Sequence, residues 1–339
     1  MLEVPIIREP TPRSRSSESL PGSKSPTQPR YSHLLYLSEA EREVYTANMQ
    51  RSSSSSSHSV RSNRSARSRA QSQSSASTHN ATRISMQSPR WADDHYPLIT
   101  TIHPENVPAS VSRDHSVFFC ARQMAQIHNA VIRALNSSWN HAPSVKPSTQ
   151  EAADFLLFNQ QLFTTLDHHH KVEDDYMFPA IEKLLGRPGA MEENTKGHQS
   201  FAEGLAIFQK YVFLTSSDEF NGTTLRHIIE SFSPELIQHL HDEIVSLMGL
   251  HVLDSSELMK IWKHTKSIAV KDTDRYFDTP WLLGCQDKSF FIDGVKCPFP
   301  GSRWITDTVV RNWHARRHAG AWRFCPSDLY GHRRQLIKA

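Results

Sequence analysis

Several features that define common protein classes are missing from this chain of 339 residues. No apolar run approaches the roughly 20 residues that a membrane-spanning helix needs, so we do not expect an integral membrane protein. The first residues, MLEVPIIREP, lack the apolar core and cleavage site of a secretory signal, so we do not expect secretion. Four scattered cysteines are too few for a disulfide scaffold. These absences favour a reducing compartment, with the cytoplasm as the first choice and the nucleus as the alternative.

Charge is unevenly distributed along the chain. Residues 1–90 carry 13 Lys/Arg and 6 Asp/Glu, whereas residues 91–339 carry 25 and 29. The mild overall basicity therefore belongs to the N-terminal part, and the body carries no general signal for nucleic-acid binding. We accordingly expect neither nucleic acid nor membrane among the partners.

The N-terminal 90 residues are predicted to be disordered. Residues 51–90 contain 16 Ser and 7 Arg without any acidic or aromatic residue, a composition that cannot bury enough apolar surface to fold. The stretch YSHLLYLSEAEREVY (31–45) has helical character and is a candidate docking motif for a protein partner. We expect three regions: this tail (1–90), a helical body (91–255) and a C-terminal extension packed on the body (256–339).

Apolar residues recur at helical spacing through the body and predict four amphipathic helices. Pro179 could kink the second helix late, and Pro234 is expected to bend the fourth, with Ser233 as an internal cap. Helices with short to medium connections favour an all-α fold, an antiparallel four-helix bundle with up-down-up-down topology. The predicted helices span residues 114–137, 149–185, 190–214 and 223–252.

The C-terminal extension is rich in aromatic residues and turns. One further helix is predicted over residues 302–318, with Gly320 as its stop. We expect Trp304, Trp313 and Trp322 to pack over the bundle. The basic cluster Arg316, Arg317, Arg323, Arg333 and Arg334 is interpreted as a solvated face.

Histidine is the unusual residue, because 17 of the 20 follow residue 90. Each predicted helix places one histidine on its apolar face, and two of these histidines are followed by a glutamate four residues later. Residues four apart share a helix face, so each pair can direct an imidazole and a carboxylate at one point. The candidate metal ligands are His128, His169, Glu173, His198, His239 and Glu243.

A cation is the simplest reason for burying two carboxylates together, since each is costly to desolvate alone. Imidazoles with carboxylates suit iron, manganese or zinc. Six ligands exceed what one tetrahedral zinc needs and suit two metals with Glu173 and Glu243 as bridges. Two non-haem iron ions are therefore the first choice. Cys285, Cys297 and Cys325 lack any C-x-x-C spacing and are interpreted as ordinary thiols.

Four short motifs carry a family resemblance: QIHNA (126–130), DHHHKVEDDYMFP (167–179), KGHQ (196–199) and QHLHDEI (238–244). In these motifs the chain resembles the hemerythrin-like, HHE cation-binding domain, over residues 114–252. The ending WRFCPSDLYG (322–331) is similar to that of fungal hemerythrin-like proteins. The resemblance implies an up-down bundle that holds a non-haem di-iron centre, with the six candidate residues as ligands.

One departure from the family pattern concerns the third helix. Dioxygen-carrying hemerythrins have a second histidine there, four residues after the first, but the residue four after His198 is Ala202. The missing ligand could come from His170 or from water. The register between His169 and His170 also stays open, although His169 repeats the spacing of His239 to Glu243.

These observations lead to a functional hypothesis of iron or oxygen handling or sensing, with dioxygen or a small redox ligand at the metal. Two alternatives remain. A di-iron oxidoreductase would activate dioxygen or peroxide, but no catalytic residue can be named, so the sequence does not decide whether the chain is an enzyme. An adaptor would use the metal structurally and act through its N-terminal tail.

Overall fold

The computed structural model describes residues 38–55, 91–271, 273–296 and 304–336. Most of the segment predicted to be disordered, residues 1–37 and 56–90, lies outside these ranges. Helix α1 (Glu39–Ser55) lies within that segment and overlaps the candidate docking motif. It packs on the body through Tyr45, whose ring centroid is 5.3 Å from that of Phe213.

The described chain is mainly helical, with one small antiparallel hairpin. No helix among the described residues is both long and apolar enough to cross a membrane. The further elements, in chain order, are η2 (Pro104–Asn106), α2 (Ser116–His141), α3 (Gln150–Val172), the π-helix η3 (Glu173–Met177), α4 (Phe178–Leu185), α5 (Glu192–Ser200), α6 (Ala202–Leu214), α7 (Gly222–Met248), η4 (Gly249–Val252), α8 (Ser255–Lys271), α9 (Asp278–Cys285), β1 (Phe291–Ile292), β2 (Val295–Lys296), α10 (Trp304–Asn312), η5 (His314–His318) and α11 (Ala319–Trp322).

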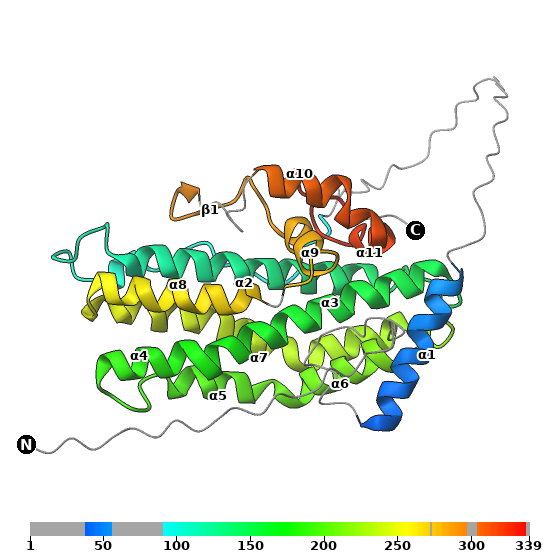
Figure 1. The fold of residues 1–339 in the computed structure, drawn as a ribbon, viewed down its shortest axis with the longest axis horizontal. Coiled ribbons are helices and arrows are strands. Elements are labelled where there is room, and N and C mark those ends of the chain that lie inside the picture. Colours follow the sequence, from blue (N-terminus) through cyan, green and yellow to red (C-terminus); the bar gives the residue numbers. More distant parts are fainter. Residues whose placement is uncertain (1–37, 56–90, 272, 297–303, 337–339) are drawn as a thin grey trace, which may run out of the picture. The chain divides into compact units, whose positions relative to one another are not determined.

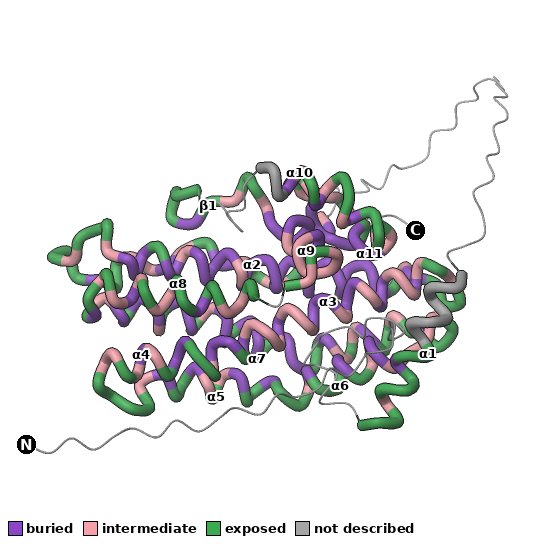
Figure 2. Tube along the Cα trace, viewed as in Figure 1, coloured by how far each residue is buried: buried purple, intermediate pink, exposed green. Residues whose placement is uncertain are grey.

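The long helices pack in a closed circuit. Helix α2 contacts α3 and α7, while α6 also contacts α3 and α7, and α5 extends this layer along α7 (Figure 1). Their buried faces enclose one core, seen in purple in Figure 2. Helices α8 and α9 cover α2 and α3 from outside, and α11 packs on α3. The circuit encloses a space in which side chains from several helices meet.

Local sequence explains where these helices begin. The side chains of His115, Thr149 and Asn221 each accept a hydrogen bond from a backbone N–H in the first turn of α2, α3 and α7. Such caps satisfy donors that the helix itself leaves unpaired. Helix α4 ends at Gly186, which adopts the left-handed conformation (φ 63°) that glycine tolerates best.

Two of the predicted helices are interrupted. The helix predicted over residues 149–185 is helical throughout residues 150–185, but the π-helix η3 lies between α3 and α4 just before Pro179. Pro179 has no N–H to continue the α-helical ladder, and Phe178 N–H bonds five residues back, to Glu173 O. The helix predicted over residues 190–214 is also divided, at the buried Phe201.

The fourth predicted helix forms one element over most of its length. Helix α7 contains Pro234 in its interior, as predicted. Ser233 does not act as an internal cap, because its hydroxyl donates to the hydroxyl of Tyr96. The last predicted turn, residues 249–252, is a 3-10 helix.

In the C-terminal extension, the prediction of one helix over residues 302–318 is wrong, because α10 ends at Asn312 and short helices follow. Trp313 is 71% exposed, so it does not pack over the body as predicted, whereas Trp322 is buried. The side chain of Trp304 lies outside the described residues. Gly320 lies inside α11, where any larger side chain would overlap Asp154, so close approach to α3 rather than helix termination requires glycine.

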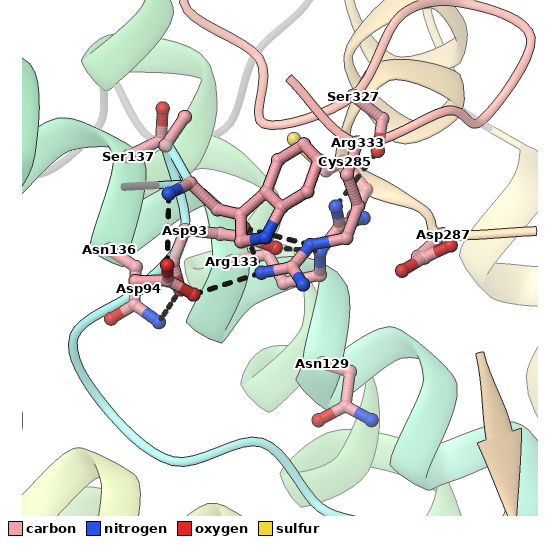
Figure 3. A network of polar contacts seen from close by, with 12 residues as sticks. Asp93, Asp94, Asn129, Arg133, Asn136, Ser137, Cys285, Asp287, Ser327 and Arg333 are labelled. Carbon is pink, nitrogen blue, oxygen red and sulfur yellow. Dashed lines mark hydrogen bonds and ion pairs between the residues drawn. The ribbon is translucent and has the colours of Figure 1, made fainter. Parts of the chain in front are cut away.

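A buried cluster of polar and charged groups links segments far apart in the sequence to α2 (Figure 3). Arg133 is 2% exposed and donates to Asp93 (2.6 Å), to the Cys285 carbonyl (2.7 Å) and to Ser327 (2.8 Å). Asp93 also accepts from Arg333 at 2.7 Å. We call these five residues the arginine cluster. It joins the segment before α2, the end of α9 and the C-terminal tail to one residue of α2.

The arginine cluster changes the interpretation of the predicted basic face. Arg333 belongs to the cluster, Arg323 pairs with Glu151, and Arg334 donates to backbone carbonyls of the tail. Three of the five predicted face residues therefore have partners within the fold.

Candidate metal centre

Seven side chains converge between α2, α3, α5 and α7 in two groups, and within each group the potential ligand atoms lie within 4.8 Å of one another. All seven are buried except one, which is partly exposed. They comprise all six residues predicted as ligands and the additional candidate. We call them the histidine–glutamate centre; the first group is His170, His198 and His239, and the second is His128, His169, Glu173 and Glu243.

Two adjacent histidines of α3, His169 and His170, both reach the centre. Consecutive residues of an α-helix point about 100° apart, which normally separates neighbouring side chains. Both histidines lie in the last turn of α3, and the π-helix begins at Glu173, whose N–H contacts the carbonyls of His169 and His170. His169 then belongs to one group and His170 to the other. Both histidines of the register question therefore lie in the centre, and the π-helix that follows them is of a kind frequent at functional sites.

Each glutamate lies between the two groups. Glu173 Oε1 is 3.2 Å from Nε2 of His169, and Oε2 is 3.7 Å from Nε2 of His198 in the other group. Glu243 Oε2 is 3.3 Å from Nε2 of His128 and 3.8 Å from Nε2 of His239. Each carboxylate is therefore close enough to contribute a metal-binding oxygen to both groups.

The centre leaves many buried polar atoms without a hydrogen-bond partner. They are the Nε2 atoms of His170, His198 and His239 and all four carboxylate oxygens of Glu173 and Glu243. Such atoms are costly to bury unpaired, and most proteins satisfy nearly all of them. Cations coordinated by nitrogen and oxygen, one in each group, would satisfy all seven. The residues present therefore fit a bound metal.

The orientation of His128 supports the same conclusion. Its Nδ1 atom lies 2.8 Å from the Leu240 carbonyl, an acceptor, so Nδ1 carries the proton and Nε2 is bare. This bare Nε2 lies 3.0 Å from Nε2 of His169 and 3.3 Å from Glu243 Oε2. Acceptors that face one another need a positive charge between them, which a metal ion supplies.

Burial sets the protonation of the centre. It lowers the pKa of His169 and His170 well below the usual value and that of His239 to about 4. Burial, reinforced by the charge of Glu243, raises the pKa of Glu173 well above its usual value. Neutral imidazoles are the form that binds metal.

Comparison with known proteins agrees with this geometry. A family model described as the hemerythrin HHE cation binding domain matches residues 121–249, a range that contains all seven residues of the centre. The protein named "Dimeric xanthone biosynthesis cluster protein R11" from Cryptosporiopsis sp. (strain 8999) is 36% identical over 250 residues. The similarity covers 73% of this chain and 92% of that protein.

The chain belongs to the hemerythrin HHE cation-binding family. No solved structure matches it. The family description supports cation binding, and the histidine–glutamate centre is a place in this hemerythrin-family chain that can hold a metal.

Some residues of the centre's surroundings were not singled out from the sequence. Gly197 is one, because any side chain at this position would overlap the ring of His239. Phe178 and Phe201 pack against His198, with ring centroids at 5.7 and 6.4 Å. The only sequence signal for Gly197 was its place directly before His198 in the KGHQ motif.

The third helix contributes a single histidine, as its sequence indicates. Ala202 is exposed and lies directly after the interruption at Phe201, so it does not face the centre. His170 lies among His198 and His239 instead. Tyr176 of the π-helix is 47% exposed and belongs to neither group.

Cysteine does not contribute to either group. Cys285 and Cys325 are buried next to one another, and burial, followed by the contact with Cys325, raises the pKa of the Cys285 thiol well above its usual value. Cys297 lies outside the described residues. Within the described part of the chain, the metal-capable groups contain only histidine and glutamate.

Proposed function

We propose that this chain holds two non-haem iron ions in the histidine–glutamate centre and serves iron or oxygen handling or sensing. The observation that supports the proposal is the set of seven buried, unpaired donor atoms that converge from several helices. The circuit of α2, α3–α4, α5–α6 and α7 is interpreted as a four-helix bundle, a fold whose core commonly houses such sites.

The two ions would be held unequally. One would be bound by His170, His198 and His239, the other by His128 and His169, with Glu173 and Glu243 shared between them. The second ion has one protein ligand fewer, and on that side we place dioxygen or a small redox ligand. When bound, such an iron pair supplies redox chemistry toward dioxygen. Imidazole and carboxylate donors also suit manganese and zinc, which are the alternatives to iron.

A di-iron oxidoreductase is the alternative function. It is favoured by the name of the relative, which places that protein in a biosynthesis cluster. Turnover of a substrate that rises in proportion to iron content would support the enzyme. A spectral change on exposure to oxygen without turnover would support a binder or sensor.

The deciding experiment measures metal content by mass spectrometry on the anaerobically purified full chain, with absorption spectra before and after admission of air. About two irons per chain and new near-ultraviolet bands in air are expected. Glu173→Ala should lose at least one metal, because it removes a shared carboxylate. Asp175→Ala is the matched control: this carboxylate of the same π-helix is 45% exposed and pairs with Lys171. One zinc or no metal in a folded protein would contradict the proposal.

A further inference from the structure

We propose that Asp174 is a positioning residue that holds the ring of His198 with Nε2 directed into the centre and strengthens it as a metal donor. The inference rests on the proposed function, since it assigns His198 to a bound metal. Asp174 was not among the residues singled out from the sequence, where it appeared only as the neighbour of Glu173.

The contact that carries the inference joins the π-helix to α5. Asp174 Oδ1 lies 3.0 Å from Nδ1 of His198. The same oxygen accepts from the hydroxyl of Thr195 at 3.4 Å, three residues earlier on α5. Glu173 and Asp174 are consecutive, so one turn of the π-helix places one carboxylate inside the centre and the next behind one of its histidines.

The chemistry of the pair fixes the state of the imidazole. A carboxylate can only accept, so Nδ1 of His198 carries the proton and Nε2 keeps its lone pair. That Nε2 is buried without a hydrogen-bond partner and lies 3.7 Å from Oε2 of Glu173. A carboxylate behind a metal-binding imidazole fixes the ring orientation and raises the basicity of the donor nitrogen.

His198 depends on this support more than His128 does. His128 is held by a neutral backbone carbonyl, that of Leu240, inside the fully buried core. His198 comes from α5, a helix of nine residues without a side-chain cap at its start, and is the one residue of the centre on that helix. Its ring is therefore oriented by a side chain that mutation can remove without touching the backbone.

The alternative is that Asp174 forms only a partly exposed surface ion pair, since its side chain is 35% exposed. Such a pair would leave metal binding unchanged. Asp175, the next residue, separates the two cases. It is 45% exposed and pairs at 2.6 Å with Lys171, which does not belong to the centre.

The first test measures the affinity of the full chain for iron(II) under anaerobic conditions by competition with a chelator. Asp174→Ala should weaken binding of the ion that His170, His198 and His239 would hold about 10- to 100-fold, the usual effect of removing such a carboxylate. Asp174→Asn, which keeps the shape and loses the charge, should give a smaller loss. Asp175→Ala should stay within about twofold of the unmodified chain, the expectation for an exposed pair. Equal affinities for Asp174→Ala and Asp175→Ala would overturn the proposal.

The second test reads the tautomer directly. In metal-free protein labelled with ¹⁵N-histidine, the ring nitrogen shifts of His198 should show Nδ1 protonated and Nε2 bare. Asp174→Ala should shift this equilibrium toward a mixture, and Asp175→Ala should not. An unchanged tautomer in Asp174→Ala would overturn the proposal. This measurement needs no metal. If the unmodified chain failed to bind iron, the proposed function would be contradicted, but the tautomer would still show whether Asp174 positions His198.

Discussion

Two buried polar clusters each include a residue of α2. They differ in how many of their polar atoms have a hydrogen-bond partner within the protein. In the arginine cluster each guanidinium nitrogen of Arg133 donates to an oxygen, and Asp93 accepts from two arginines (Figure 3). In the histidine–glutamate centre seven donor atoms have no partner. Arg133 and Glu243 are equally inaccessible, at 2% and 0% exposed. Burial alone does not distinguish a structural cluster from a binding site, but the balance of donors and acceptors does.

The difference follows from the energetics of buried charge. A buried ionic group that is fully hydrogen-bonded holds distant segments in one arrangement. A buried carboxylate without partners carries its desolvation cost until a cation offsets it. The arginine cluster should therefore matter most for folding, and the histidine–glutamate centre most for metal binding. The following predictions test that division, from the largest expected effect to the smallest.

Arg133→Met should lower the free energy of unfolding by about 3–5 kcal/mol, because it leaves part of a buried ion pair without its partner. Arg333 still contacts Asp93, which favours the lower end of this range. Chemical denaturation of the metal-loaded chain gives the value, and metal content should stay unchanged. Lys171→Met, which removes an exposed pair with Asp175, should cost no more than about 1 kcal/mol. Loss of metal without loss of stability in Arg133→Met would contradict the division.

Acid should destabilise the metal-free chain through His239. Its pKa is lowered by burial to about 4 in the folded state, from 6.5. As pH falls below 6.5, the unfolded chain takes up this proton first, so stability present above pH 6.5 is lost progressively toward pH 4. The loss can reach about 3 kcal/mol for this group. Denaturation curves across this range measure it.

The matched variant for the acid effect is His239→Gln, which cannot take up the proton. Glu173 acts in the opposite direction, because its pKa is raised in the folded state and it is protonated there before the unfolded chain. The comparison of the two metal-free proteins isolates His239 from that effect. Identical pH dependence with and without His239 would show that its burial carries no such cost.

Glu173→Gln should have opposite effects with and without metal. In the metal-free chain it removes a carboxyl group that is costly to bury, so unfolding should require about 1 kcal/mol more at neutral pH. With iron present the variant should lose metal, and the stabilisation that binding provides disappears with it. Thermal unfolding of both forms measures this, with Asp175→Asn as the exposed control. Destabilisation of the metal-free variant would show that Glu173 is already satisfied by the protein.

Sequence periodicity accounts for much of this architecture and less of its detail. The 3.6-residue spacing placed His128, His169, His198 and His239 on apolar faces, and all four are in the centre. It did not place His170, because periodicity assigns one of two adjacent residues to a face, whereas His169 and His170 enter different groups of the centre. The arginine cluster was equally hidden, since Arg133 pairs with Asp93 and Ser327, which lie 40 and 194 residues away. Pairings at such separation follow from tertiary packing.

The smallest effect is expected where the family pattern and this fold disagree. Ala202→His would restore the second third-helix histidine, four residues after His198, yet we expect unchanged metal content and a stability change within about 0.5 kcal/mol. The chain breaks between α5 and α6 at Phe201, so residue 202 no longer shares a face with His198 and is exposed to solvent. His170→Ala is the informative partner variant, because His170 lies among the first group and its loss should lower metal content. If Ala202→His rescued the metal content of His170→Ala, the third helix would have to be continuous in solution. A histidine at position 202 could then replace His170 as a ligand.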